Sequence, residues 1–126
     1  VAAGSCNSPQ FIELGGEAVN GVVTTTLFFA EDPRPEAVPF VAAYQDAYDE
    51  TPDSFAALAY DGVKILAWAA VEGGMERAGL QQALVNGVDI PSVVYGPFRF
   101  AEDRRVEGAE LQVIQVKDGA FALYEG

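Results

Sequence analysis

The chain has 126 residues, half of them hydrophobic and 11% aromatic, and a formal net charge of −12. This length suits one ordinary domain, and the composition is typical of a packed globule and excludes a disordered chain. The excess of 19 acidic over 7 basic residues argues against nucleic acid and anionic membranes as partners, because the chain has no basic patch to bind phosphate.

The first third of the chain predicts a helix, a strand and a second helix. Ser8-Pro9 has the pattern of an N-cap followed by proline in the first turn, and it opens a short helix that Gly15-Gly16 weakens. The β-branched and aromatic residues of 21–29 predict a central strand. After a proline-rich turn, apolar residues at helical spacing predict a helix over 36–49.

The apolar stretch FAALAYDGVKILAWAA, residues 55–70, predicts a long helix. On this helix Ser54, Asp61 and Glu72 fall on one narrow stripe, which we expect to face solvent. The rest of its circumference is then expected to be covered by a sheet and neighbouring helices of a layered α/β domain. We expect Asp61 and Lys64 to form a weak surface ion pair.

The last part of the chain changes from helix to strands. Residues 75–86 predict a weaker amphipathic helix, whereas 93–100 and 110–116 predict strands. Lys117-Asp118-Gly119 predicts a hairpin turn into a last strand over 120–124. The order of elements favours an α/β fold, but three helices follow a single strand, so we expect further strands to lie outside this chain.

The residue types that usually carry out chemistry are scarce. The chain has no histidine, which excludes Ser-His-Asp and Cys-His catalysis, and Cys6 has no charged neighbour to lower its pKa. Three groups of carboxylates lie at helix ends or turns, where solvated acids are ordinary: Asp46/Asp49/Glu50, Glu102/Asp103 and Glu31/Asp32. Calcium-loop and phosphate-loop spacings are absent. We therefore expect no enzyme, no metal and no cofactor.

Targeting signals are not visible in the sequence. No run of about 18 apolar residues lacks charges, and the first ten residues have neither a basic nor an apolar signal region. The chain begins at Val1, which suits either a processed product or a piece of something longer.

Five stretches, in this order, resemble the C-terminal part of type I periplasmic solute-binding proteins, in the branch that serves ABC transporters of branched-chain amino acids. They are FIELGGEAVNGVV (11–23), PFVAAYQDAYDETPDSFAALAYDGVKIL (39–66), GLQQAL (79–84), YGPFRFAED (95–103) and ELQVIQVKDGAF (110–121). Each motif is weak alone, but together they cover almost the whole chain.

The resemblance implies a partial periplasmic binding protein-like type I fold, three-layer α/β/α, with parts of two lobes. Residues 1–27 and 107–126 would belong to the second lobe and 28–106 to the first, with crossings near 28 and 105. The remaining strands would lie in an N-terminal portion.

Candidate binding residues follow from the same resemblance. Phe55 matches a position where the family places an aromatic ring against the ligand side chain. Gly4, Ser5 and Cys6 match the second-lobe loop where amino-acid binders often place an acid for the ammonium group. This loop has no carboxylate, so related amides and aromatic acids stand beside branched-chain amino acids as ligand classes.

The implied function is the substrate-binding component of an ABC importer, which closes two lobes on a small solute, as a Venus flytrap does. Its partner would be the permease, and its location the periplasm or the cell exterior, with or without a lipid anchor. Two alternatives stay open: a ligand-sensing receptor domain of the same fold, and a small hydrolase that uses carboxylates. We expect the isolated chain to bind ligand weakly or not at all and to form homodimers through exposed sheet edges.

Overall fold

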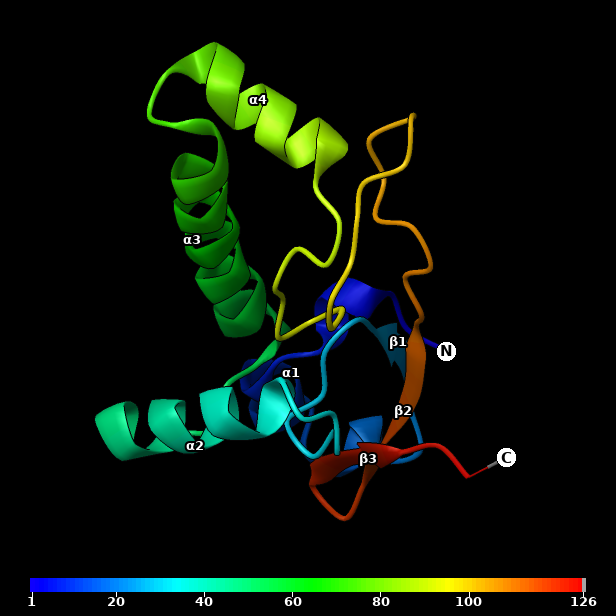
Figure 1. Ribbon diagram of the computed structural model, residues 1–126. Coiled ribbons are helices and arrows are strands. Elements are labelled where there is room, and N and C mark those ends of the chain that lie inside the picture. Colours follow the sequence, from blue (N-terminus) through cyan, green and yellow to red (C-terminus); the bar gives the residue numbers. More distant parts are fainter. Residues whose placement is uncertain (126) are drawn as a thin grey trace.

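The computed structural model describes residues 1–125, excluding the side chain of Ser5 (Figure 1). The elements in chain order are η1 (Gly4–Cys6), α1 (Pro9–Gly15), η2 (Gly16–Val19), β1 (Val23–Thr26), α2 (Ala37–Tyr48), α3 (Ser54–Gly73), α4 (Arg77–Asn86), β2 (Gln112–Lys117) and β3 (Ala120–Leu123).

The three strands form one antiparallel sheet in the order β1-β2-β3. Thr24 lies opposite Ile114, and Val116 lies opposite Phe121. The turn between β2 and β3 has positive φ at Asp118 (51°) and Gly119 (79°), as a tight hairpin requires. The predicted Asp-Gly hairpin is therefore confirmed.

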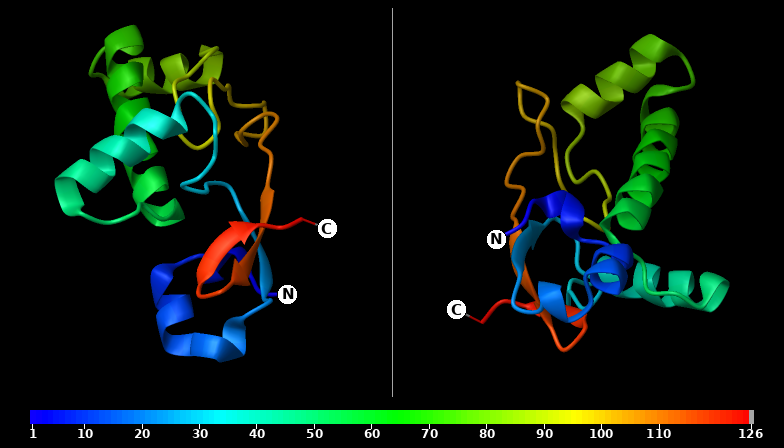
Figure 2. Two further views of the ribbon diagram at one scale, coloured as in Figure 1. Left: turned by 90° about the horizontal axis from the view of Figure 1, so that it is seen from below. Right: turned by 180° about the vertical axis from the view of Figure 1, so that it is seen from behind.

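The elements lie in two groups (Figure 2). The sheet and α1 lie near both termini, and α2, α3 and α4 lie on the other side, with two connecting segments between the groups. One segment leads from β1 to α2 and the other leads into β2. A hydrophobic core joins the first segment to the helices: Phe28, Ala37, Phe40, Ala57 and Val94 are all buried and pack together.

The helices agree closely with the sequence pattern. Ser8 caps α1, with its hydroxyl accepting a hydrogen bond from the Phe11 amide at 3.4 Å. α1 ends at the predicted weak point, because Gly16 takes a positive φ of 52° and the chain continues as the tighter η2.

The predicted strand over 93–100 is wrong. This region holds only two isolated bridges, Ile90 to Phe98 and Phe100 to Val106. Pro91 and Pro97 lack the amide hydrogen that a strand needs, and Gly96 takes a φ of 71°. The apolar residues here therefore pack as a folded loop against the helices.

The predicted solvent-facing stripe of α3 is wrong at two of its three positions, because Ser54 and Asp61 are buried and Glu72 alone is exposed. Apolar side chains of the same helix are also exposed, among them Leu58, Val63, Leu66 and Val71. Asp61 accepts hydrogen bonds from the amides of Val93 (2.8 Å) and Val94 (3.2 Å), and from the Ser92 hydroxyl. It does not form the expected surface pair with Lys64.

Length and composition alone would allow α3 to cross a membrane. Its buried Asp61, which holds the loop after α4, ties the helix to the folded body instead. The prediction that further strands cover its apolar side concerns residues outside this chain and stays a prediction.

Candidate functional site

The loop predicted to bind ligand folds as η1 and packs against β1. The Ala2 amide donates a hydrogen bond to the Val23 carbonyl at 2.8 Å, and the Thr24 hydroxyl donates to the Ala3 carbonyl at 2.9 Å. A Cβ atom at Gly4 would lie 2.9 Å from the Thr25 carbonyl oxygen. Only glycine therefore allows the loop to approach the strand this closely.

Of the other predicted loop residues, Cys6 is half-buried with a free thiol. The side chain of Ser5 lies outside the described part of the structure.

Asn7, directly after η1, links this loop to the opposite group of elements. Its side chain is 6% exposed, and its Nδ2 lies 2.7 Å from Thr26 Oγ1, 3.4 Å from the Phe28 carbonyl oxygen and 3.4 Å from Ser54 Oγ. The first two partners belong to β1 and the segment after it, and the third begins α3. The amide therefore fixes the end of η1 beside the first turn of α3.

Phe55 lies in that first turn, which is capped by the preceding residues. The Asp53 carboxylate caps the helix by accepting a hydrogen bond from the Ala56 amide at 2.8 Å. The Phe55 side chain is 56% exposed, so it is not a core residue of this chain. An exposed aromatic ring on a capped helix start is a rigid apolar surface, suited to contact a ligand.

The structure thus brings the two predicted parts of the site together, since Asn7 and Ser54 directly adjoin them in sequence. Asn7 and Ser54 also line a groove of about 450 Å³, with residues of α1, of the segment after β1 and of the β2-β3 turn. Phe55 is not among the residues that line this groove.

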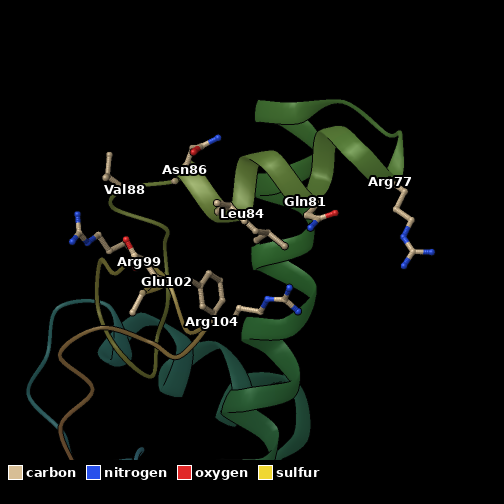
Figure 3. Close-up of a pocket in the computed structure, with 12 residues that line it drawn as sticks. Arg77, Gln81, Leu84, Asn86, Val88, Arg99, Glu102 and Arg104 are labelled. Atoms are coloured by element: carbon tan, nitrogen blue, oxygen red, sulfur yellow. The ribbon is translucent and has the colours of Figure 1, made fainter.

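A larger cavity of about 840 Å³ lies between α4 and residues 99–104, away from the predicted residues (Figure 3). Arg99 on its wall is paired with Glu107, which raises the pKa of Arg99 and has its own pKa lowered in return. Arg77 and Gln81 of α4 line the opposite wall. No sequence motif indicates a site here.

A buried polar cluster that the sequence pattern did not predict lies between the two connecting segments. Asp32 is 4% exposed, forms an ion pair with Arg34 at 2.6 Å and accepts a hydrogen bond from the Gln112 side chain. Burial alone would raise the pKa of Asp32, but the hydrogen bonds and charge of Arg34, with Gln112, hold it below the usual value. The expectation of a solvated acid at Glu31/Asp32 is therefore wrong for Asp32.

Within residues 1–125, no three side chains of the metal-binding types come together. The pKa of Tyr95 is raised by burial and by the nearby charge of Asp61. This shift keeps the phenol neutral, and that of Asp32 keeps the carboxylate ionised, which are the ordinary states of both groups. The contacts of Asp32 and Asp61 described above hold segments of the chain together.

Several solved structures are similar to this chain. A leucine-binding protein from Thermotoga maritima is 26% identical to this chain, with a TM-score of 0.88. The match covers 98% of this chain and 35% of the Thermotoga chain. A putative branched-chain amino acid ABC transporter protein from Rhodospirillum rubrum is 35% identical, with a TM-score of 0.72 over 97% of this chain and 36% of its own.

An ABC transporter substrate-binding protein from Desulfitobacterium hafniense, solved in complex with Leu, is 28% identical, with a TM-score of 0.75. It covers 84% of this chain and 32% of its own. This chain therefore spans about a third of the length of the structures that it matches. A search of curated proteins gives no match.

A family model described as "Periplasmic binding protein" matches residues 1–120. That range includes every element of the structure up to β2 and the first residue of β3. The expected resemblance and fold class are confirmed, since the chain adopts part of the type I fold of these proteins. This chain belongs to the periplasmic binding protein family.

Proposed function

We propose that this chain acts within a two-lobed receptor that captures a small solute for an ABC importer. The observation that carries the proposal is the contact of Asn7 with Ser54, which sets the η1 loop beside the helix start that presents Phe55. Ligands of such receptors bind where two lobes meet, because both lobes contact them only in the closed state.

We assign the two groups of elements to the two lobes. Residues 1–27 and 107–126 belong to the second lobe, and 28–106 to the first, with crossings near 28 and 105. The two connecting segments in Figure 2 support this division, because each passes from one group to the other.

The proposed ligand is a branched-chain amino acid or a related amide or aromatic acid. The exposed Phe55 ring supports an apolar ligand side chain, and two of the similar structures have names that refer to leucine. In the proposed site, the η1 loop, Gly4–Cys6, contacts the ligand through its backbone. The loop has no carboxylate to bind an ammonium group. Amides and aromatic acids therefore remain within the proposed class.

Capture without chemical change is the proposed activity. The similar structures are named as binding and transporter proteins rather than enzymes. A hydrolase that uses two carboxylates needs two acids facing one cleft. The partners of the buried Asp32 are Arg34 and Gln112, and those of the buried Asp61 are a hydroxyl and two amides.

The proposed partner of the complete receptor is an ABC permease, and its proposed place is the periplasm or the cell exterior. One similar structure, from Rhodopseudomonas palustris, is described as an extracellular ligand-binding receptor, at 22% identity and a TM-score of 0.81. That likeness shows the fold, and the family supports the location.

The test is calorimetric titration of the complete receptor with leucine, isoleucine, their amides and benzoate. We expect at least one of these to bind, and Phe55→Ala to raise its Kd roughly tenfold, equal to about 1.4 kcal/mol, because the ring surface is lost. Tyr48→Ala is the matched control, since Tyr48 is an aromatic residue 65% exposed at the far end of α2.

An unchanged Kd in Phe55→Ala would contradict the role of Phe55. Binding of none of these solutes would contradict the proposed ligand class. For the 126-residue chain alone we expect weak or no binding, so micromolar binding by it would show that the site needs no further segment.

A further inference from the structure

The buried ion pair between Asp32 and Arg34 begins as a local turn around Pro33. The Arg34 amide donates to Asp32 Oδ1 at 2.9 Å, and Arg34 Nε donates to Asp32 Oδ2 at 2.7 Å. The carboxylate is therefore held by the backbone and the side chain of the same residue, which fixes its orientation.

Three contacts join this turn to other parts of the chain. Arg34 Nη1 donates to the Val94 carbonyl, Arg34 Nη2 lies 3.5 Å from the Leu27 carbonyl, and the Gln112 side chain donates to Asp32 Oδ2. Val94 is itself held by Asp61 of α3. The pair thus joins both connecting segments to each other and to the helical group.

A second Asp-X-Arg turn in the same chain shows what is special about the first. Asp103 accepts from the Arg105 amide at 3.1 Å and from Arg105 Nε at 2.8 Å, which is the same local geometry. However, the Asp103 side chain is 50% exposed and that of Arg105 is 85% exposed, against 3% and 30% for Asp32 and Arg34. An ion pair as exposed as this contributes little, whereas breaking a buried one leaves an uncompensated charge.

We propose that Asp32 and Arg34, with Gln112, are positioning residues for ligand capture. They form a fixed point between the segment after β1, the start of β2 and the loop after α4, so that lobe closure brings Phe55 to the ligand in a single orientation. This inference rests on the proposed two-lobed receptor. Loss of the fixed point lowers the population of the binding-competent arrangement, and the apparent Kd rises in proportion.

The experiment uses the complete receptor with Asp32→Asn and, separately, Gln112→Ala, which removes the side-chain hydrogen bond from the start of β2 to Asp32 and leaves the contacts of Arg34 in place. We expect each to raise the Kd for leucine about tenfold or more, within the usual range of coupling between sites. We also expect less compaction on leucine addition, measured as the radius of gyration by small-angle X-ray scattering.

Two matched controls accompany them. Asp103→Asn alters the exposed turn, and Gln115→Ala removes a glutamine from the same strand, β2, at a position of opposite parity to Gln112. Both are expected to match the wild type within twofold. Circular dichroism checks folding, and if Asp32→Asn fails to fold, Gln112→Ala decides.

Failure of the proposed function and failure of this inference give different results. If the wild type binds none of the solutes tested, the proposed ligand class fails. Scattering without ligand still tests this inference, which then requires a larger radius of gyration in Asp32→Asn than in Asp103→Asn. If Asp32→Asn and Gln112→Ala match their controls in both Kd and scattering, the inference is overturned.

Discussion

Two buried aspartates serve as tertiary links in a chain whose net charge is −12. Asp61 is compensated by two backbone amides and a hydroxyl, and Asp32 by an arginine and an amide side chain. A buried carboxylate without such partners would be costly, so each constrains the segments that supply its donors. The donors to Asp61 lie 31 to 33 residues away in sequence, and one donor to Asp32, Gln112, lies 80 residues away.

The lowered pKa of Asp32 predicts a specific acid sensitivity. A carboxylate with a folded-state pKa below its unfolded value stabilises the protein above the unfolded pKa, which is about 3.8. This contribution is lost as the pH falls from there through the lowered folded-state pKa. Urea unfolding of wild type and Asp32→Asn is therefore expected to show a stability difference at pH 7 that shrinks below about pH 4.

The exposed turn supplies the comparison for this measurement. Asp103→Asn is expected to change the free energy of unfolding little at either pH, because its ion pair is open to solvent. A difference between wild type and Asp32→Asn that stays constant from pH 7 to pH 3 would show that the charge of Asp32 is not the stabilising feature.

At the scale of elements, the contact between α3 and α4 depends on two glycines. A Cβ atom at Gly79 would lie 1.9 Å from the Gly73 carbonyl oxygen, and one at Gly73 would lie 2.1 Å from that of Gly79. These atoms are backbone, so neither can move aside without shifting a helix. The two helices can approach this closely only where both residues lack a side chain.

Gly79→Ala is accordingly expected to lower the free energy of unfolding by about 2 kcal/mol or more, through overpacking. Gly62→Ala is the control, since Gly62 lies inside α3 and a Cβ atom added there would meet no other atom within 4 Å. There alanine should raise the stability by about 0.5–1 kcal/mol, because it favours the helix. Denaturant unfolding measures both, and a loss in Gly62→Ala equal to that in Gly79→Ala would refute the packing explanation.

Local signals predicted the helices and the hairpin because their causes lie within a few residues. The caps at Ser8 and Asp53 and the Asp118-Gly119 turn are of this kind. The stripe prediction for α3 is wrong at Asp61 for the opposite reason, since the groups that bury Asp61 come from residues 92–94. A polar residue on a helix has the same pattern whether water or a distant amide satisfies it.

The candidate site shows the same limit. A resemblance indicated Phe55 and the loop Gly4–Cys6, and the structure adds that Asn7, directly after the loop, bonds Ser54, directly before Phe55. The Asp32 cluster escaped prediction, although the Asp-Pro-Arg sequence is a local hint of a turn, because its burial depends on Gln112. Sequence spacing cannot show which of two Asp-X-Arg turns is buried.

At the scale of the whole molecule, the apolar side of α3 is open. Val63 is 69% exposed and Leu66 is 56% exposed, and the outer edge of β3 has no partner strand among residues 1–125. Apolar surface and a free strand edge both favour association. We therefore expect the 126-residue chain to self-associate, with a sedimentation coefficient that increases with concentration.

Leu66→Glu tests which surface is responsible. If the α3 face carries the association, this change moves the sedimentation toward a monomer, because a charge cannot be buried there without a partner. Glu72→Gln on the same helix is the control, since its side chain is already exposed. A wild-type chain that remains monomeric at all concentrations would contradict the prediction.

The hydrogen bond between Asp32 and Gln112 also restricts how the chain can change length. An insertion between Phe28 and Asp32 or within β2 would shift one donor or acceptor out of reach of the other. An insertion near Asp103, where the turn is open to solvent, would leave that register untouched. Homologues should therefore vary in loop length at the second turn and keep a constant spacing at the first.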